Sequence, residues 1–186
     1  LKVIVTDYQY RSLAAEEEVF ASIGATLEPH QCRSAEEVLA ASQGADGILV
    51  QHFPFTRDII ARLDRCRVIS CYRIGTDNVD LEAATEKGIV VVNVPGYCVD
   101  EVSDHALMLL LACARKLVPL AASTKLGTWD FNLARPVYRL RGRTLGIIGF
   151  GKIGQRLAQK VEPLGLSVLA YDPFLPAEAF ARLGVD

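Results

Sequence analysis

Short apolar runs alternate with amphipathic segments through the first hundred residues of the chain. The runs are rich in Val and Ile, which predicts β-strands, and the segments between them carry helix signals. Ser34 and Glu37 have the spacing of a capping box, Thr56 and Asp80 can act as N-caps, and Gly24, Gly44 and Gly88 can each close a helix. The expected strands are 2–6, 25–28, 46–50, 67–70 and 89–94, and the expected helices are 13–23, 35–43, 56–64 and 80–87.

These strands are apolar on both faces, as a parallel sheet covered by helices requires. Strands that alternate with helices, with no internal repeat, are typical of α/β layer proteins. Residues 1–98 are therefore predicted to form a flavodoxin-like parallel-sheet domain.

A different pattern begins after Pro95 and Gly96. Residues 100–117 read as one long helix, and 144–172 as a strand, a helix and a second strand. Residues 119–143 are expected to be an irregular arm or connection between domains. Residues 99–186 are thus predicted to hold a long helix and one βαβ unit, an incomplete Rossmann domain. The apolar positions of the long helix recur at three and four and predict one buried stripe: Val102, Ala106, Leu109, Leu110, Cys113 and Leu117.

The βαβ unit contains the glycine pattern of a dinucleotide site. Gly149, Gly151 and Gly154 stand between the first strand and the helix, and Asp172 ends the second strand. In this pattern the first glycine permits a tight turn, the second admits the pyrophosphate, and the third lets helix and strand pack closely.

A helix that starts at this turn presents free amides to a phosphate. The amides of Lys152 and Ile153 open the helix, whose positive end would face the pyrophosphate. Asp172 would accept hydrogen bonds from the adenosine ribose, which favours NAD over a 2′-phosphorylated cofactor. A purely structural glycine turn is the alternative interpretation.

A second constellation follows the fourth expected strand, where α/β proteins bind ligands. Amides near Ile74 and Gly75 could hold a small carboxylate, and Arg73 would add positive charge. The alternative is a strand-to-helix turn capped by Asp77 and Asp80. The residues alone favour neither the carboxylate-binding loop nor the capped turn.

Composition narrows the function classes. The chain has 186 residues, 51% of them hydrophobic, and a net charge of −2, which predicts a globular protein without a nucleic-acid or membrane partner. No apolar run reaches the about 18 residues of a membrane span. The five cysteines show no metal-ligand spacing, so we expect reduced, mostly buried thiols in a cytoplasmic protein, and no metal.

Three segments in this order, 71–80, 90–117 and 140–173, resemble the D-isomer-specific 2-hydroxyacid dehydrogenases, which include phosphoglycerate, glycerate/hydroxypyruvate and formate dehydrogenases and the C-terminal-binding co-repressors. The resemblance implies a flavodoxin-like substrate domain hinged to an NAD-binding Rossmann domain, and reversible hydride transfer between NAD and a small 2-hydroxy or 2-keto acid. It also implies that Ile74 and Gly75 touch substrate and nicotinamide, and that Val102 lies near the cofactor.

The chain departs from the family pattern in two respects. Cys71 stands where the family loop has Arg, and Arg73 where it has its first Gly. No residue matches the catalytic Arg, Glu and His of the family, and His105 is interpreted as structural. We therefore expect a truncated dehydrogenase with little or no turnover, or alternatively a non-enzymatic NAD-sensing or dimerising remnant like the co-repressors. Since one βαβ unit cannot bury both faces of its strands, a homodimer through residues 100–172 is expected.

Overall fold

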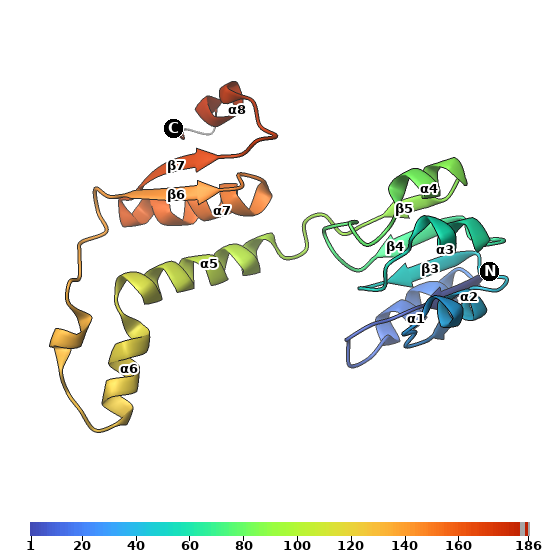
Figure 1. Cartoon of the computed structure of the whole chain (residues 1–186), viewed down its shortest axis with the longest axis horizontal. Coiled ribbons are helices and arrows are strands. Elements are labelled where there is room, and N and C mark those ends of the chain that lie inside the picture. Colours follow the sequence, from blue (N-terminus) through green and yellow to red (C-terminus); the bar gives the residue numbers. More distant parts are fainter. Residues whose placement is uncertain (183–184, 186) are drawn as a thin grey trace. The chain divides into compact units, whose positions relative to one another are not determined.

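The computed structural model describes residues 1–182 and 185, and the chain divides into two compact units, Leu1–Tyr97 and Cys98–Asp186. Figure 1 shows a sheet with helices in the first unit, and a strand pair with helices in the second. Each unit is described by itself.

The first unit contains a parallel five-stranded sheet in the order β2-β1-β3-β4-β5, which is the flavodoxin-like order. Every neighbouring pair is parallel, so each connection crosses over through a helix. The predicted alternation is confirmed. The elements are β1 (Lys2–Val5), α1 (Ala14–Ser22), β2 (Thr26–Pro29), α2 (Ala35–Ala41), β3 (Gly47–Val50), α3 (Arg57–Arg62), β4 (Val68–Cys71), α4 (Leu81–Glu86) and β5 (Val90–Val92).

The core of this unit lies under the three central strands. Ile4, Ile48 and Ile69 are almost fully buried, whereas Val90 and Val92 of β5 are 59% and 41% exposed. The prediction that all strands are covered on both faces is therefore wrong for the edge strands β2 and β5, which are mostly exposed. An edge strand has one neighbour fewer, so its side chains are covered less completely.

Local signals set the helix ends. Ser34 accepts a hydrogen bond from the amide of Glu37 and Asp80 accepts one from the amide of Ala83, as the predicted caps require. Thr56 occupies the cap position of α3 but makes no such bond.

The second unit consists of a long helix, a bent extension and one βαβ unit. Strands β6 and β7 are parallel, and Figure 1 shows α7 between this pair and α5. Its elements are α5 (Val99–Ala114), α6 (Leu117–Lys125), the 3-10 turn η1 (Phe131–Ala134), β6 (Thr144–Ile148), α7 (Lys152–Val161), the 3-10 turn η2 (Glu162–Leu164), β7 (Ser167–Tyr171) and α8 (Ala177–Arg182).

Two expectations for this unit are wrong. Residues 119–143 are not wholly irregular, because α6 begins at Leu117, and Lys116, with φ of 56°, turns the chain between α5 and α6. Pro119 is tolerated because it lies in the first turn of α6, where its missing amide costs no helix bond. The predicted stripe on α5 is also not buried: Val102, Leu109 and Leu117 are 41–57% exposed, Cys113 is exposed, and the one buried residue described for α5 is Ser103.

One face of the β6–β7 pair is open. Ile147 and Phe150 are buried in a small core with Ala158 of α7. On the opposite face Ile148, Leu169 and Tyr171 are 90%, 54% and 64% exposed. The alternation of exposure along both strands shows that the unit covers only one side of its own sheet.

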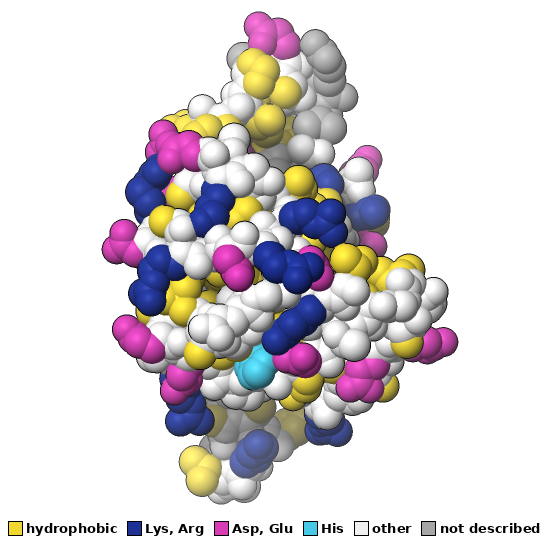
Figure 2. All heavy atoms as spheres, turned by 90° about the vertical axis from the view of Figure 1, so that its right-hand side faces the viewer, with side chains coloured by type: hydrophobic (Ala, Val, Ile, Leu, Met, Phe, Trp, Pro, Cys, Tyr) yellow, Lys and Arg dark blue, Asp and Glu magenta, His cyan; other side chains and the backbone are white. Residues whose placement is uncertain are grey.

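No single helix in the described part of the chain is long and apolar enough to cross a membrane; α5 and α6 together, bent by 67°, meet the criteria of length and composition only. On the face shown in Figure 2, Lys and Arg side chains are interspersed with Asp and Glu, and hydrophobic side chains lie scattered among them.

Candidate dinucleotide site and substrate loop

The loop between β6 and α7 has the geometry that its glycines predict. Gly149 has φ of +90°, a conformation that L side chains rarely adopt. Gly154 is buried in the first turn of α7, and a Cβ there would collide with the carbonyl oxygen of Gly149. These two glycines therefore permit the turn and the close approach of helix to strand.

Gly151 has a different role. It is the N-cap of α7, its φ of −69° is open to any residue, and a Cβ at this position would meet nothing within 4 Å. Neither backbone strain nor packing explains why a glycine stands there. The space beside it is where a ligand can approach the backbone, next to the helix-opening residues Lys152 and Ile153.

Among the described residues, no side chain caps the N-terminus of α7. The amide of Gln155 closes the first helical turn on the carbonyl of Gly151 at 3.0 Å. The amides before Gln155 thus lie at the positive end of a ten-residue helix. These groups fit a diphosphate, which needs several donors and positive potential.

The carboxylate of Asp172 reaches the glycine turn. Its two oxygens accept from the amide of Phe150 at 2.7 Å and from that of Phe174 at 2.9 Å, while Gly149 donates to the Tyr171 carbonyl at 2.8 Å. These bonds tie the end of β7 to the turn after β6. Each carboxylate oxygen keeps an acceptor site, so Asp172 can still bind a ribose hydroxyl.

A polar clamp between α5 and α7 was missed by sequence reasoning. The ammonium of Lys160 donates to the Asp100 carbonyl at 2.9 Å, to the Ser103 hydroxyl at 2.9 Å and to Asp104 at 2.6 Å, and Arg156 pairs with Asp100 at 3.1 Å. The hydrogen bond to Asp104 is the main reason why the pKa of Lys160 is raised. The spacing of Asp100 and Asp104, one helical turn apart, is the signal that points to a shared cation.

This clamp positions the start of α5 next to α7. Val102 lies in the first turn of α5, donates its amide to the Cys98 carbonyl at 3.0 Å, and keeps an exposed side chain. His105, about one turn further, is exposed as well. The interpretation of His105 as a structural residue stays a prediction.

The candidate substrate loop follows β4 and is fixed by backbone bonds. Val94 donates to the Arg73 carbonyl at 3.1 Å and the Asn93 side chain donates to the Ile74 carbonyl at 2.5 Å. Arg73 is absent from the described residues with positive φ, so it replaces the family glycine without backbone strain. Gly75 is exposed, as a residue that contacts a ligand through its backbone would be.

The guanidinium of Arg73 is already paired. It contacts Asp77 at 2.7 Å, one turn along the loop, and 30% of the Arg73 side chain is exposed. Asp80, in contrast, caps α4. Asp80 is therefore a helix cap, as the turn interpretation expects, whereas Asp77 pairs with Arg73 instead of capping the helix. The binding of a carboxylate by this loop stays a prediction.

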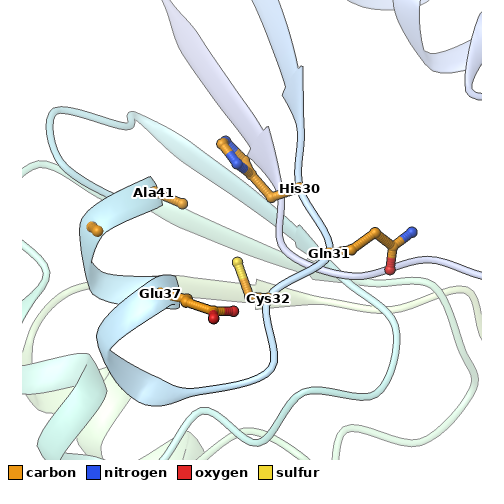
Figure 3. A pocket seen from close by; sticks show the side chains of 6 residues that line it. His30, Gln31, Cys32, Glu37 and Ala41 are labelled. Carbon is orange, nitrogen blue, oxygen red and sulfur yellow. The ribbon is translucent and has the colours of Figure 1, made fainter.

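A hollow of about 460 Å³ lies beside α2, lined by His30, Gln31, Cys32, Glu37, Ala40 and Ala41. Figure 3 shows the Cys32 thiol on the α2 side of its loop and Gln31 pointing away. Burial, together with the charges of Glu37 and Asp7, raises the pKa of this thiol, which disfavours the reactive thiolate. Among the described residues no group of His, Cys, Asp and Glu side chains could hold a metal ion.

All five cysteines are free thiols. Cys32 and Cys71 are buried and Cys66 and Cys98 half-buried, but Cys113 is exposed on α5, contrary to the expected stripe.

Comparison with known proteins places these features in a family. Residues 3–184 match the family described as D-isomer specific 2-hydroxyacid dehydrogenase, catalytic domain. The chain is 36% identical to D-3-phosphoglycerate dehydrogenase of Methanocaldococcus jannaschii, over all of this chain and 35% of that protein. It is 37% identical to glycerate dehydrogenase of Methylorubrum extorquens, over 75% of this chain and 46% of that protein.

The fold agrees as well. The structure of D-lactate dehydrogenase from Aquifex aeolicus, solved with NAD and lactic acid, superposes with a TM-score of 0.81 at 24% identity and covers 99% of this chain and 55% of that one. The chain thus spans about a third to a half of the curated relatives it matches here.

Proposed function

Because this chain belongs to the D-isomer-specific 2-hydroxyacid dehydrogenase family, we propose that it supplies the substrate loop and the dinucleotide turn of an NAD-dependent oxidoreductase acting on a small 2-hydroxy or 2-keto acid. The observation that carries the proposal is the space beside Gly151 at the uncapped start of α7. A bound NAD would supply the hydride-accepting chemistry.

In this proposal the residues of the turn bind and orient the cofactor. Gly149 and Gly154 shape the turn, Gly151 leaves room for the diphosphate, and the amides of Lys152 and Ile153 donate to it. Asp172 accepts from the ribose, and Val102 lies at the helix start near the cofactor.

The substrate carboxylate is assigned to the loop after β4. The amides of Ile74 and Gly75 and the guanidinium of Arg73 would bind it, and Arg73 would exchange Asp77 for the substrate. This exchange is favourable because Asp77 is a mostly exposed partner, and exposed ion pairs contribute little.

We further propose that these 186 residues alone have no turnover, since none of them matches the family's catalytic Arg, Glu and His. The test is to titrate NAD into the ¹⁵N-labelled protein and then to assay NADH oxidation with hydroxypyruvate. We expect saturable shifts of the Gly151 and Ile153 amides and no oxidation above background. Unshifted turn amides would refute the cofactor assignment, and oxidation above background would refute the proposed inactivity. The relatives named above are enzymes and do not support the alternative of an interaction module.

A homodimer through residues 100–172 is part of the proposal, with a cytoplasmic location. Exposed apolar side chains on α5 and on the open β6–β7 face support it: Met108 and Leu109 are each 50% exposed and Ile148 is 90% exposed. Sedimentation should give the mass of a dimer that Ile148→Glu dissociates, whereas Val19→Glu on α1, also at an exposed apolar position, should not. A monomer at every concentration would contradict the dimer.

A further inference from the structure

Three arginines line one hollow at the start of β6. Arg139, Arg141 and Arg143, with Gly142 and Thr144, line an open hollow of about 540 Å³. This hollow lies at the amino end of β6, whereas the dinucleotide turn follows its carboxyl end. A strand of this length separates the two places by roughly 15 Å.

The three arginines of this hollow lie close together in the sequence and line the same hollow without an acidic partner among the described residues. Arg57, Arg65 and Arg156 contact carboxylates at 2.5, 2.9 and 3.1 Å. In residues 1–182 and 185 no carboxylate pairs with the three arginines of the hollow. Neighbouring like charges repel one another, and a counter-anion relieves this repulsion.

Neutral groups hold the Arg143 guanidinium in place. Arg143 donates through Nε to the Arg139 carbonyl at 3.2 Å and lies over the Tyr138 ring at 4.5 Å from its centre. This leaves the two terminal nitrogens of Arg143 free to donate elsewhere. Holding the side chain in advance lowers the entropy cost of binding a ligand.

Arg141 packs on a glycine that leaves room for it. A Cβ on Gly165 would come within 3.0 Å of the Arg141 Cγ and 3.2 Å of its Nη1, and the Gly142 amide donates to the Gly165 carbonyl at 2.7 Å. Gly142 has φ of +78°, so the chain turns directly after Arg141.

We propose that Arg139, Arg141 and Arg143 form a binding site for a small multivalent oxyanion carrying a phosphate or diphosphate group. Guanidinium groups bind phosphate oxygens through paired N–H donors, and three cations need more than one negative charge to be compensated. The ligand is either free phosphate or diphosphate, or the phosphate of a larger metabolite. The site is distinct from the dinucleotide turn and does not depend on the proposed function.

Inorganic diphosphate is the probe, followed by ¹⁵N NMR of the whole chain at constant ionic strength. We expect saturable shifts of the Gly142 and Thr144 amides, with an affinity that Arg141→Gln and Arg143→Gln each lower by about tenfold. Arg115→Gln, at an exposed arginine after α5, removes the same charge elsewhere in the unit and should leave the affinity within about twofold of wild type.

The readout separates the two anion sites, because shifts at Gly151 report the dinucleotide turn and shifts at Gly142 report the arginine hollow. A phosphate monoester of a small sugar is titrated in the same way. If it binds more tightly than diphosphate, the ligand is a phosphorylated metabolite; if diphosphate binds more tightly, the ligand is the free anion. Shifts confined to the turn, no saturation at Gly142, or an equal loss in Arg115→Gln would overturn the proposal.

Discussion

The two glycines that flank the start of α7 offer a test in which stability and binding separate. At Gly154 an added Cβ would collide with the Gly149 carbonyl oxygen, so α7 and the turn must move apart. Overpacking costs about 1–3 kcal/mol and replacing a helical glycine by alanine returns about 1 kcal/mol, so Gly154→Ala should lose up to about 2 kcal/mol. At Gly151 a Cβ meets nothing, so Gly151→Ala should be neutral or gain about 0.4–1 kcal/mol.

Gly151→Ala should leave the stability unchanged or raised, but it should weaken the binding of NAD. Its Cβ would occupy the space assigned to the diphosphate, and losing one charge-assisted amide bond costs about tenfold or more in affinity. Hydrogen exchange at the Ile147 and Ala158 amides reports the stability of this unit alone, and the NAD titration reports binding. If Gly151→Ala destabilised the unit as much as Gly154→Ala, or bound NAD like wild type, the assignment of its space to a ligand would be refuted.

Three further outcomes are expected. Asp172→Asn removes the charge that repels a 2′-phosphate, so the preference for NAD over NADP should fall by about tenfold; an unchanged ratio of the two affinities would contradict the ribose assignment. Asp7 accepts from the His52 amide at 2.6 Å and from two neighbouring amides, so Asp7→Ala should cost about 1.5–3 kcal/mol in urea denaturation, and an unchanged midpoint would refute its role in holding that loop. Partial burial raises the pKa of Cys66 to about 11 from 9.0, so iodoacetamide should alkylate exposed Cys113 long before half-buried Cys66; equal alkylation rates would contradict this protection. The contribution of Cys66 to stability, present below pH 9, should be lost as the pH rises to 11.

The sheet of the first unit could be predicted because its signals are local. Each strand is a short Val- and Ile-rich run, and Gly24, Gly44 and Gly88 do have positive φ, as helix-closing glycines require. The edges could not be predicted, because β5 reads Val-Val-Val like a central strand. Which strands lie at an edge depends on the order of the sheet, and that order is not written in any single segment.

The glycine turn was equally predictable, since Gly149 and Gly154 each answer a local steric requirement. The pairing of Arg73 with Asp77 was harder to predict, because the same segment could bind a ligand or begin a helix. The burial of the apolar stripe of α5 was predicted wrongly for a different reason. Periodicity shows that a helix has an apolar face, but it does not show which partner covers that face. In the described unit α7 contacts α5 at Ser103 and its acidic neighbours, and the apolar face stays exposed.

The clamp around Lys160 explains why that helix can nevertheless keep its place. A helix whose apolar face is uncovered gains little from packing, and exposed ion pairs taken singly contribute little. Here one ammonium satisfies a backbone carbonyl, a fully buried hydroxyl and a carboxylate at once, and Arg156 adds a second cation on the same helix. Both cations lie on α7, and the first residues of α7 follow the dinucleotide turn. The helix that would present its amino end to a cofactor therefore also holds α5 in place beside itself. The apolar face of α5 is thereby left free for the dimer contact proposed above, without loss of the geometry at the turn.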